Sequence, residues 1–184
     1  MISKGAEYKM SQGEKTRTLV MTALFTAIVF VATRINIPTG IGSHIVHVGD
    51  SMIYLAACIL PLPYAMAAGA IGAALSDALT PGCMVYVIPT LIIKATLVLY
   101  FTHNKGKFIC TRNVVALILA GVTGVLGYYW ADVIVTGNFV AGLAAILPGL
   151  IQPLGSAIVF LAVGGAFDIM GVKGKLSRQL RGNV

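Results

Sequence analysis

The segment TLVMTALFTAIVFVAT, residues 18–33, contains no charged residue, and Arg34 follows it. It belongs to a chain of 184 residues of which 58% are hydrophobic and 10% are charged, with a mean hydropathy of +0.90. Soluble domains carry roughly 25% charged residues, so this chain cannot cover its surface with polar groups in water. We therefore predict an integral membrane protein whose first span is this segment.

Further apolar segments follow the first and are separated by short polar or proline-containing stretches. A helix needs about 20 residues to cross ~30 Å of hydrocarbon, so the chain has room for six spans with short loops. The expected spans after the first are about 50–60, 64–79, 86–101, 114–131 and 148–167. We expect region 132–147 to hold a loop or a short interfacial helix, and residues 18–170 to form an all-α membrane protein, a six-transmembrane-helix bundle.

Basic residues gather in three segments of the chain. Residues 1–17, 103–113 and 171–184 hold four, three and four of the 13 lysine and arginine residues. An even number of spans separates these segments, so they lie on one side of the membrane, which the positive-inside rule makes the cytoplasm. We predict a cytoplasmic N-terminal segment (1–17) and a basic cytoplasmic tail (171–184) on a multi-pass protein of the bacterial plasma membrane. This topology explains the net charge of +7 without a nucleic-acid partner.

Lys94 lies in the middle of the fourth expected span. A lysine at the bilayer centre costs about 2.5–3.5 kcal/mol on insertion scales, and such residues usually have a function. Tyr86, Thr90 and Lys94 recur every four residues and so share one face of a helix. This pattern favours a cation that binds a ligand or lines a pathway. The alternative is a structural ion pair with Asp77 or Asp50.

A second polar group opens the second expected span. His47, Asp50 and Tyr54 fall on one helix face, which favours ligand recognition. Metal binding by His44, His47 and Asp50 is a weaker alternative, because no full zinc-site spacing accompanies the two histidines. In the third interpretation, Asp50 stabilises the positive end of the helix and the histidines are ordinary loop residues.

Two further groups lie near expected span ends. Trp130 and Asp132 belong to YYWAD, residues 128–132, which is either an aromatic wall on which a ring stacks or an interfacial belt. Gln152, with Ser156 four residues later, either binds a ligand or joins helices.

Familiar catalytic motifs are missing from the sequence. It contains neither GxxxxGK[ST] nor HExxH, and no serine–histidine–acid arrangement stands out, so we expect no enzyme activity, cofactor or bound metal. It also lacks an obvious internal repeat, which argues against a complete secondary transporter. These features indicate a part of a larger assembly.

The chain resembles a substrate-binding S component of an energy-coupling factor (ECF) vitamin transporter from Lys15 to about Lys175. The resemblance rests on the order and spacing of segments 23–27, 47–50, 69–77, 89–94, 128–132 and 148–152.

The resemblance implies a six-helix bundle with an outward-facing pocket. It also implies three kinds of partner: a water-soluble vitamin, a transmembrane coupling protein on which Ala23 and Ala27 dock, and two cytoplasmic ATPases. Nickel and cobalt members of the family carry histidine immediately after Met1, where this chain has Ile2, which argues against metal transport. Ligand contact is carried over to His47, Asp50, Asp77, Tyr86, Lys94, Trp130, Asp132 and Gln152; Tyr54 and Thr90 share helix faces with these residues and complete the predicted set.

Lysine, aspartate and aromatic side chains together suit a small hydroxylated heteroaromatic ring. We expect a pyridoxine-type vitamer (vitamin B6) or a thiamine pyrimidine precursor first, with riboflavin as the third candidate. The competing hypothesis is a stand-alone channel, a proton-coupled transporter or a small membrane enzyme, in which Lys94 and the aspartates form an ion path.

Overall fold

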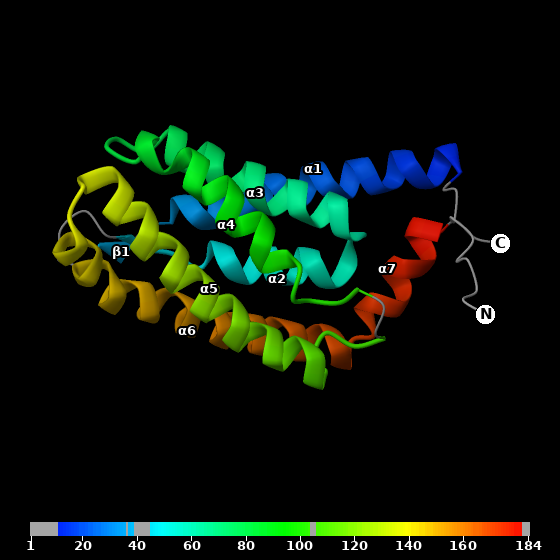
Figure 1. Ribbon diagram of the computed structural model, residues 1–184. Coiled ribbons are helices and arrows are strands. Elements are labelled where there is room, and N and C mark those ends of the chain that lie inside the picture. Colours follow the sequence, from blue (N-terminus) through cyan, green and yellow to red (C-terminus); the bar gives the residue numbers. More distant parts are fainter. Residues whose placement is uncertain (1–10, 36, 39–44, 104–105, 182–184) are drawn as a thin grey trace, which may run out of the picture.

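The computed structural model describes residues 11–35, 37–38, 45–103 and 106–181. The described chain is helical apart from two short strands (Figure 1). Its elements are α1 (Gln12–Arg34), β1 (Ile37–Pro38), β2 (Ile45–Val46), α2 (Gly49–Ile59), α3 (Leu62–Ala78), the 3₁₀ turn η1 (Met84–Tyr86), α4 (Val87–Val98), α5 (Thr111–Thr136), α6 (Phe139–Ile169) and α7 (Val172–Arg181). The predicted all-α class is confirmed, with one helix more than expected in the tail.

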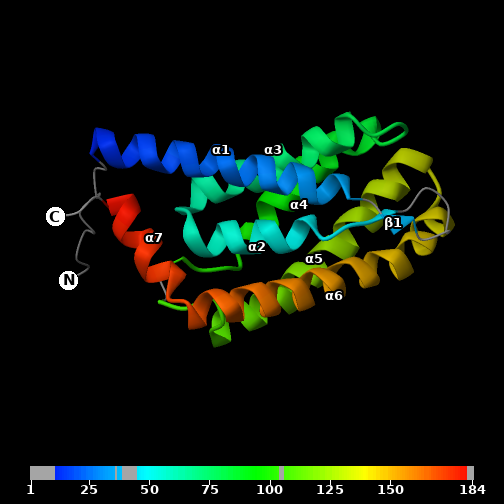
Figure 2. The same cartoon turned by 180° about the vertical axis from the view of Figure 1, so that it is seen from behind.

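The helices run back and forth along one long axis. The start of α1 and all of α7 lie at one end, which we call the α7 end, whereas β1 and β2 and the turn between α5 and α6 lie at the other, the strand end (Figures 1 and 2). The two strands pair antiparallel, Ile37 with Val46 and Pro38 with Ile45. The orientation of these ends across a membrane remains a prediction from the basic residues.

Helix α2 is the centre of the bundle. It contacts α1, α3, α4 and α6, and the run Ile53–Cys58 is buried throughout. With 11 residues, α2 is shorter than the about 20 residues that a membrane crossing needs, and it lies inside the bundle. Glycine makes the close packing possible, because a Cβ atom on Gly69 of α3 would lie 2.9 Å from Ile53.

The outer surface of the bundle is apolar. Large side chains on α5 and α6 are exposed, among them Ile118 (67%), Ile134 (79%) and Ile158 (69%). Three described helical segments are long and apolar enough to cross a membrane: Gln12–Arg34, Thr111–Thr136 and Gly149–Ile169. Two shorter apolar helical segments, Gly49–Ile59 and Met84–Val98, accompany them. This distribution of apolar surface suits a multi-pass protein surrounded by lipid.

Region 132–147, predicted as a loop or a short interfacial helix, is neither. Helix α5 continues to Thr136 and α6 begins at Phe139, so the two helices are joined by two residues. Gly137 adopts a left-handed conformation (φ 67°) that ends α5, and the Asn138 side chain accepts a hydrogen bond from the backbone N–H of Val140 at 2.8 Å to start α6. The segment is less hydrophobic because it contains the capping residues Gly137 and Asn138, while the backbone on both sides of them is helical.

Helix α1 also begins before the first expected span. Ser11 and Glu14 form a capping box, in which each side chain accepts a hydrogen bond from the other residue's backbone N–H. At the other end of the chain, Gly171 (φ 62°) ends α6, and the predicted basic tail folds into α7. Helices therefore extend past the apolar segments, because helical hydrogen bonding does not depend on hydropathy.

Candidate functional site

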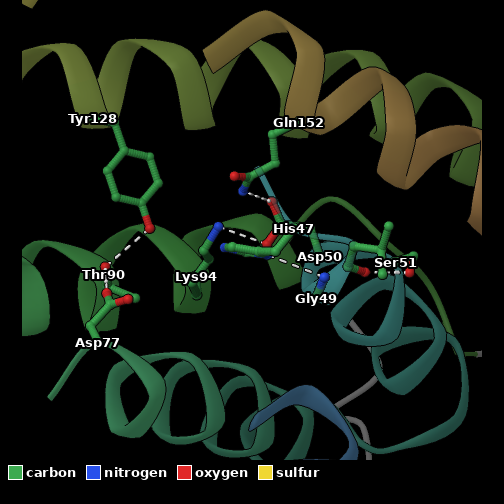
Figure 3. A network of polar contacts seen from close by, with 10 residues as sticks. His47, Gly49, Asp50, Ser51, Asp77, Thr90, Lys94, Tyr128 and Gln152 are labelled. Carbon is green, nitrogen blue, oxygen red and sulfur yellow. Dashed lines mark hydrogen bonds and ion pairs between the residues drawn. The ribbon is translucent and has the colours of Figure 1, made fainter. Parts of the chain in front are cut away.

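A buried ion pair joins α4 to α2. The Nζ atom of Lys94 donates a hydrogen bond to Oδ1 of Asp50 at 2.6 Å, and the two residues are 1% and 4% exposed (Figure 3). From α6, the Nε2 atom of Gln152 donates to the other carboxylate oxygen at 2.9 Å. Of the two acids predicted as partners of Lys94, Asp50 forms the pair. Both oxygens of its carboxylate are hydrogen-bonded, as a buried charge requires.

The start of α2 fixes the position of Asp50. Asp50 lies in the first turn, where the helix dipole favours a negative charge. A Cβ atom on Gly49 would overlap Oγ1 of Thr33, so glycine allows α2 to start directly against α1. The backbone N–H of Gly49 donates to Nδ1 of His47 at 3.2 Å. Burial lowers the pKa of His47, which precedes the helix, to about 4, so its imidazole is neutral at pH 7 and Nδ1 can accept this bond.

A second polar group lies beside the ion pair. The hydroxyl of Thr90 donates to Oδ2 of Asp77 at 2.5 Å and lies 3.0 Å from the Tyr128 hydroxyl. The Nζ atom of Lys94 lies 5.1 Å from the centroid of the Tyr128 ring, a cation–π distance that links the two groups. We call the linked residues the polar cluster: Asp50, Asp77, Thr90, Lys94, Tyr128 and Gln152 (Figure 3). They come from five different helices, so the cluster forms only in the folded bundle.

The predicted stripe along α4 is confirmed. Tyr86, which precedes α4, donates to Oδ1 of Asp132 on α5 at 2.6 Å. Thr90 and Lys94 meet Tyr128 one turn further along each helix. The three predicted side chains thus face α5 in order, and the polar contacts extend from the cluster toward the strand end.

Two of the predicted site residues outside the cluster pack against other aromatic rings. Tyr54 is 1% exposed and stacks on Phe101 with ring centroids 4.7 Å apart. Trp130 is 53% exposed and packs edge-on against Tyr129 and Phe139. Tyr54 belongs to the aromatic core, and Trp130 lies on the surface of the bundle.

Tyr128 is the site residue that the sequence reasoning missed. Three adjacent aromatic residues occupy 128–130, and Trp130 was chosen among them. The signal that distinguishes Tyr128 is its spacing of four residues from Asp132, which places the two on one helix face. Ser156, a turn beyond Gln152, is buried and its hydroxyl has no hydrogen-bond partner within the described part of the chain.

Small residues on α1 and on α3 have different surroundings. Ala23 and Ala27 are exposed on α1. On α3, in contrast, a Cβ atom on Gly72 would lie 2.7 Å from the Thr26 carbonyl oxygen, so this glycine lets α3 pack closely against α1 inside the bundle.

The chemistry of the cluster is that of a polar binding site. Lys94 and Asp50 have opposite charges, and Asp77 adds a second carboxyl group. Gln152 and Thr90 add neutral donors and acceptors, and Tyr128 adds an aromatic face. Among the residues that the structure describes, no group of three or more His, Cys, Asp or Glu side chains could hold a metal ion. His44, part of the predicted metal alternative, lies outside the described residues.

The bundle is that of a multi-pass membrane protein, and charged residues inside such a bundle mark a candidate functional site. The family model described as ECF-type riboflavin transporter, S component, matches residues 13–167, and the chain belongs to this family. Comparison with curated proteins gave no match. The matched range runs from the first turn of α1 almost to the end of α6 and includes the whole polar cluster. The resemblance to an S component is confirmed, and the family is a component of a transporter rather than an enzyme.

Proposed function

We propose that this chain captures riboflavin at the polar cluster and delivers it to an ECF-type importer in a bacterial plasma membrane. The observation that carries the proposal is the buried Lys94–Asp50 pair with Gln152 as its third member, in a chain that matches a riboflavin-type family. The sequence led us to favour a B6 vitamer or a thiamine pyrimidine. The family description favours riboflavin instead.

Riboflavin complements the side chains of the cluster. One edge of its flat ring carries an N–H between two carbonyl oxygens, and its side chain carries hydroxyl groups. Lys94 can donate to a ring carbonyl, Asp50 can accept from the N–H or a hydroxyl, and Gln152 can do either. Stacking on Tyr128 would bury the ring face. Riboflavin is neutral, so its binding leaves the charges of Lys94 and Asp50 compensated by each other.

Access requires a change at the strand end. Lys94 and Asp50 are almost completely buried, so a ligand must exchange hydrogen bonds with residues that now bond one another. The Tyr86–Asp132 pair extends the polar contacts toward the strand end, which makes that end the favoured route. If the basic segments lie in the cytoplasm, the strand end faces the outside.

The remaining partners follow from family membership. We infer that the chain associates with a transmembrane coupling protein and two cytoplasmic ATPases, because S components bind substrate and do not hydrolyse ATP. The exposed Ala23 and Ala27 of α1 are the proposed docking residues, since small side chains allow another helix to approach closely.

Binding to the purified protein tests the proposal. Riboflavin is fluorescent, and stacking on a tyrosine should quench its emission, so titration in detergent measures the affinity directly. Pyridoxine and the thiamine pyrimidine serve as competitors, and mass spectrometry identifies any small molecule that copurifies. Saturable quenching without competition supports riboflavin. Competition by a B6 vitamer would return the preference to vitamin B6, and no response to any of the three would remove the proposal.

A further inference from the structure

A groove lies on the surface near the α7 end, between the residues that follow α4 and the start of α5. Its volume is about 400 Å³. The lining residues are Leu99, Tyr100, Thr111, Arg112, Val115, Ala116 and Leu119. They come from the end of α4 and the first turns of α5, and none of them belongs to the polar cluster. The proposed function therefore does not account for this groove.

The groove has a charged mouth and an apolar body. Arg112, Val115 and Leu119 recur at i, i+3 and i+7, so they follow one another along a single face of α5. Val115 and Leu119 are 48% and 46% exposed, and Leu99 across the groove is 47% exposed. The lining contains one cation and no acid. A molecule that fits it has an anionic head and an apolar chain.

Arg112 is held at the mouth of the groove. Its Nε atom donates to the Tyr100 carbonyl oxygen at 3.5 Å, and the Tyr100 hydroxyl is fixed 2.8 Å from the Thr123 hydroxyl. The other guanidinium nitrogens make no hydrogen bond or ion pair with the residues that the structure describes. Cys110, the residue before α5, makes no side-chain cap in that part of the chain. The first-turn N–H groups beside Arg112 thus add to a positive local potential.

The position of the groove fixes the kind of occupant. Helix α5 is one of the three segments long enough to span a membrane, and Arg112 is in its first turn. The mouth therefore lies at the level of lipid headgroups, and the body extends into the hydrocarbon. We propose that the groove binds an anionic phospholipid, with the phosphate on Arg112 and an acyl chain along Val115 and Leu119. Basic sites between membrane helices recognise such headgroups.

Native mass spectrometry of the full-length protein in detergent tests this proposal, with phosphatidylglycerol and phosphatidylcholine as probes. Replacing Arg112→Gln should weaken phosphatidylglycerol binding about fivefold, the effect of one basic residue near an anionic surface. Arg112→Lys should retain most of it. Lys175→Gln is the matched control, because Lys175 is an exposed cation of α7 outside the groove. Circular dichroism confirms that each variant is folded.

Val115→Trp provides a second test, since a larger side chain fills the body of the groove and should reduce lipid binding without a change of charge. Equal phosphatidylglycerol affinity in Arg112→Gln and Lys175→Gln would overturn the proposal, and so would unaltered binding to Val115→Trp. If millimolar inorganic phosphate displaces the lipid, the site binds small anions instead. If the Val115→Trp variant binds the lipid normally but no longer associates with the coupling protein, the proposal is overturned and the groove is a protein interface.

Discussion

The Nζ atom of Lys94 lies 2.6 Å from Oδ1 of Asp50, and these two residues tie α4 to the first turn of α2 inside the bundle. Removing one partner of a buried pair usually costs about 3–5 kcal/mol, because the other charge is left uncompensated. The pair therefore affects both the stability of the protein and the proposed binding of riboflavin, and variants can separate these two roles.

Lys94→Met should destabilise the protein by about 3–5 kcal/mol and weaken riboflavin binding strongly. The double variant Lys94→Met with Asp50→Asn should recover much of the stability, because the uncompensated carboxylate of Asp50 is gone, yet it should not recover binding. Thermal unfolding in detergent and riboflavin titration measure the two effects. Normal riboflavin affinity in Lys94→Met would assign the lysine a purely structural role.

Tyr128 and Trp130 should respond differently to substitution. Tyr128→Leu removes the ring beside Lys94 and should reduce riboflavin affinity and fluorescence quenching, whereas Tyr128→Phe keeps the ring and loses only the bond to Thr90, worth about 0.5–1.5 kcal/mol. Trp130→Leu is the control, since Trp130 is exposed and outside the polar cluster. A larger loss of affinity in Trp130→Leu than in Tyr128→Leu would show that riboflavin stacks on Trp130 and not on Tyr128.

Bulky substitutions on the exposed face of α1 should uncouple binding from transport. Ala23→Leu and Ala27→Leu should abolish riboflavin uptake by cells while the purified protein keeps its affinity, because the coupling protein can no longer approach α1. Ile118→Trp, on the exposed face of α5, is the control and should support normal uptake. Unchanged uptake in both alanine variants would show that docking uses another surface.

Gly49→Ala should destabilise the protein by about 1–3 kcal/mol, because the new methyl group overlaps the Thr33 side chain at the start of α2. The shift should also move Asp50 and weaken riboflavin binding. Gly124→Ala, inside α5 with nothing within 4 Å of the added atom, should be neutral or stabilising by about 1 kcal/mol. Equal thermal stabilities of the two variants would contradict the close contact between α1 and α2.

Stability should fall in mild acid because of His47. Its pKa is about 4 in the folded protein, below the ordinary value of 6.5, so the unfolded chain binds a proton first as the pH decreases. The free energy of unfolding should therefore decrease between about pH 6.5 and pH 4 and depend less on pH outside this window. The slope should be smaller in His47→Gln, measured by thermal unfolding across the same range. Equal slopes would place His47 in solvent.

Hydropathy and charge predicted most of the fold. Lys94 is prominent because a charge in an apolar span is costly, and its spacing from Tyr86 and Thr90 placed the three residues on one face, which in the structure contacts α5. The turn at Gly137 was hidden, because a two-residue connection between helices leaves no long polar stretch. Hydropathy indicates whether a side chain lies in lipid or in water, whereas capping residues indicate where a helix ends.

The site itself was harder to predict than the fold. Which acid pairs with Lys94 depends on the relative positions of α2, α3 and α4, and the sequence contains no measure of these positions. The choice of Trp130 over Tyr128 has a related cause. Successive residues point about 100° apart on a helix, so Tyr128 and Trp130, two positions apart, point to nearly opposite sides, and composition does not distinguish them.

The enclosure of α2 separates Asp50 from the thickness of the bilayer. A membrane a few ångströms thinner or thicker acts on helices in contact with lipid, which respond by tilting. Because α2 is surrounded by other helices, such adjustments reach Asp50 only through those neighbours. The position of this carboxylate should thus change little when the lipid composition alters the membrane thickness.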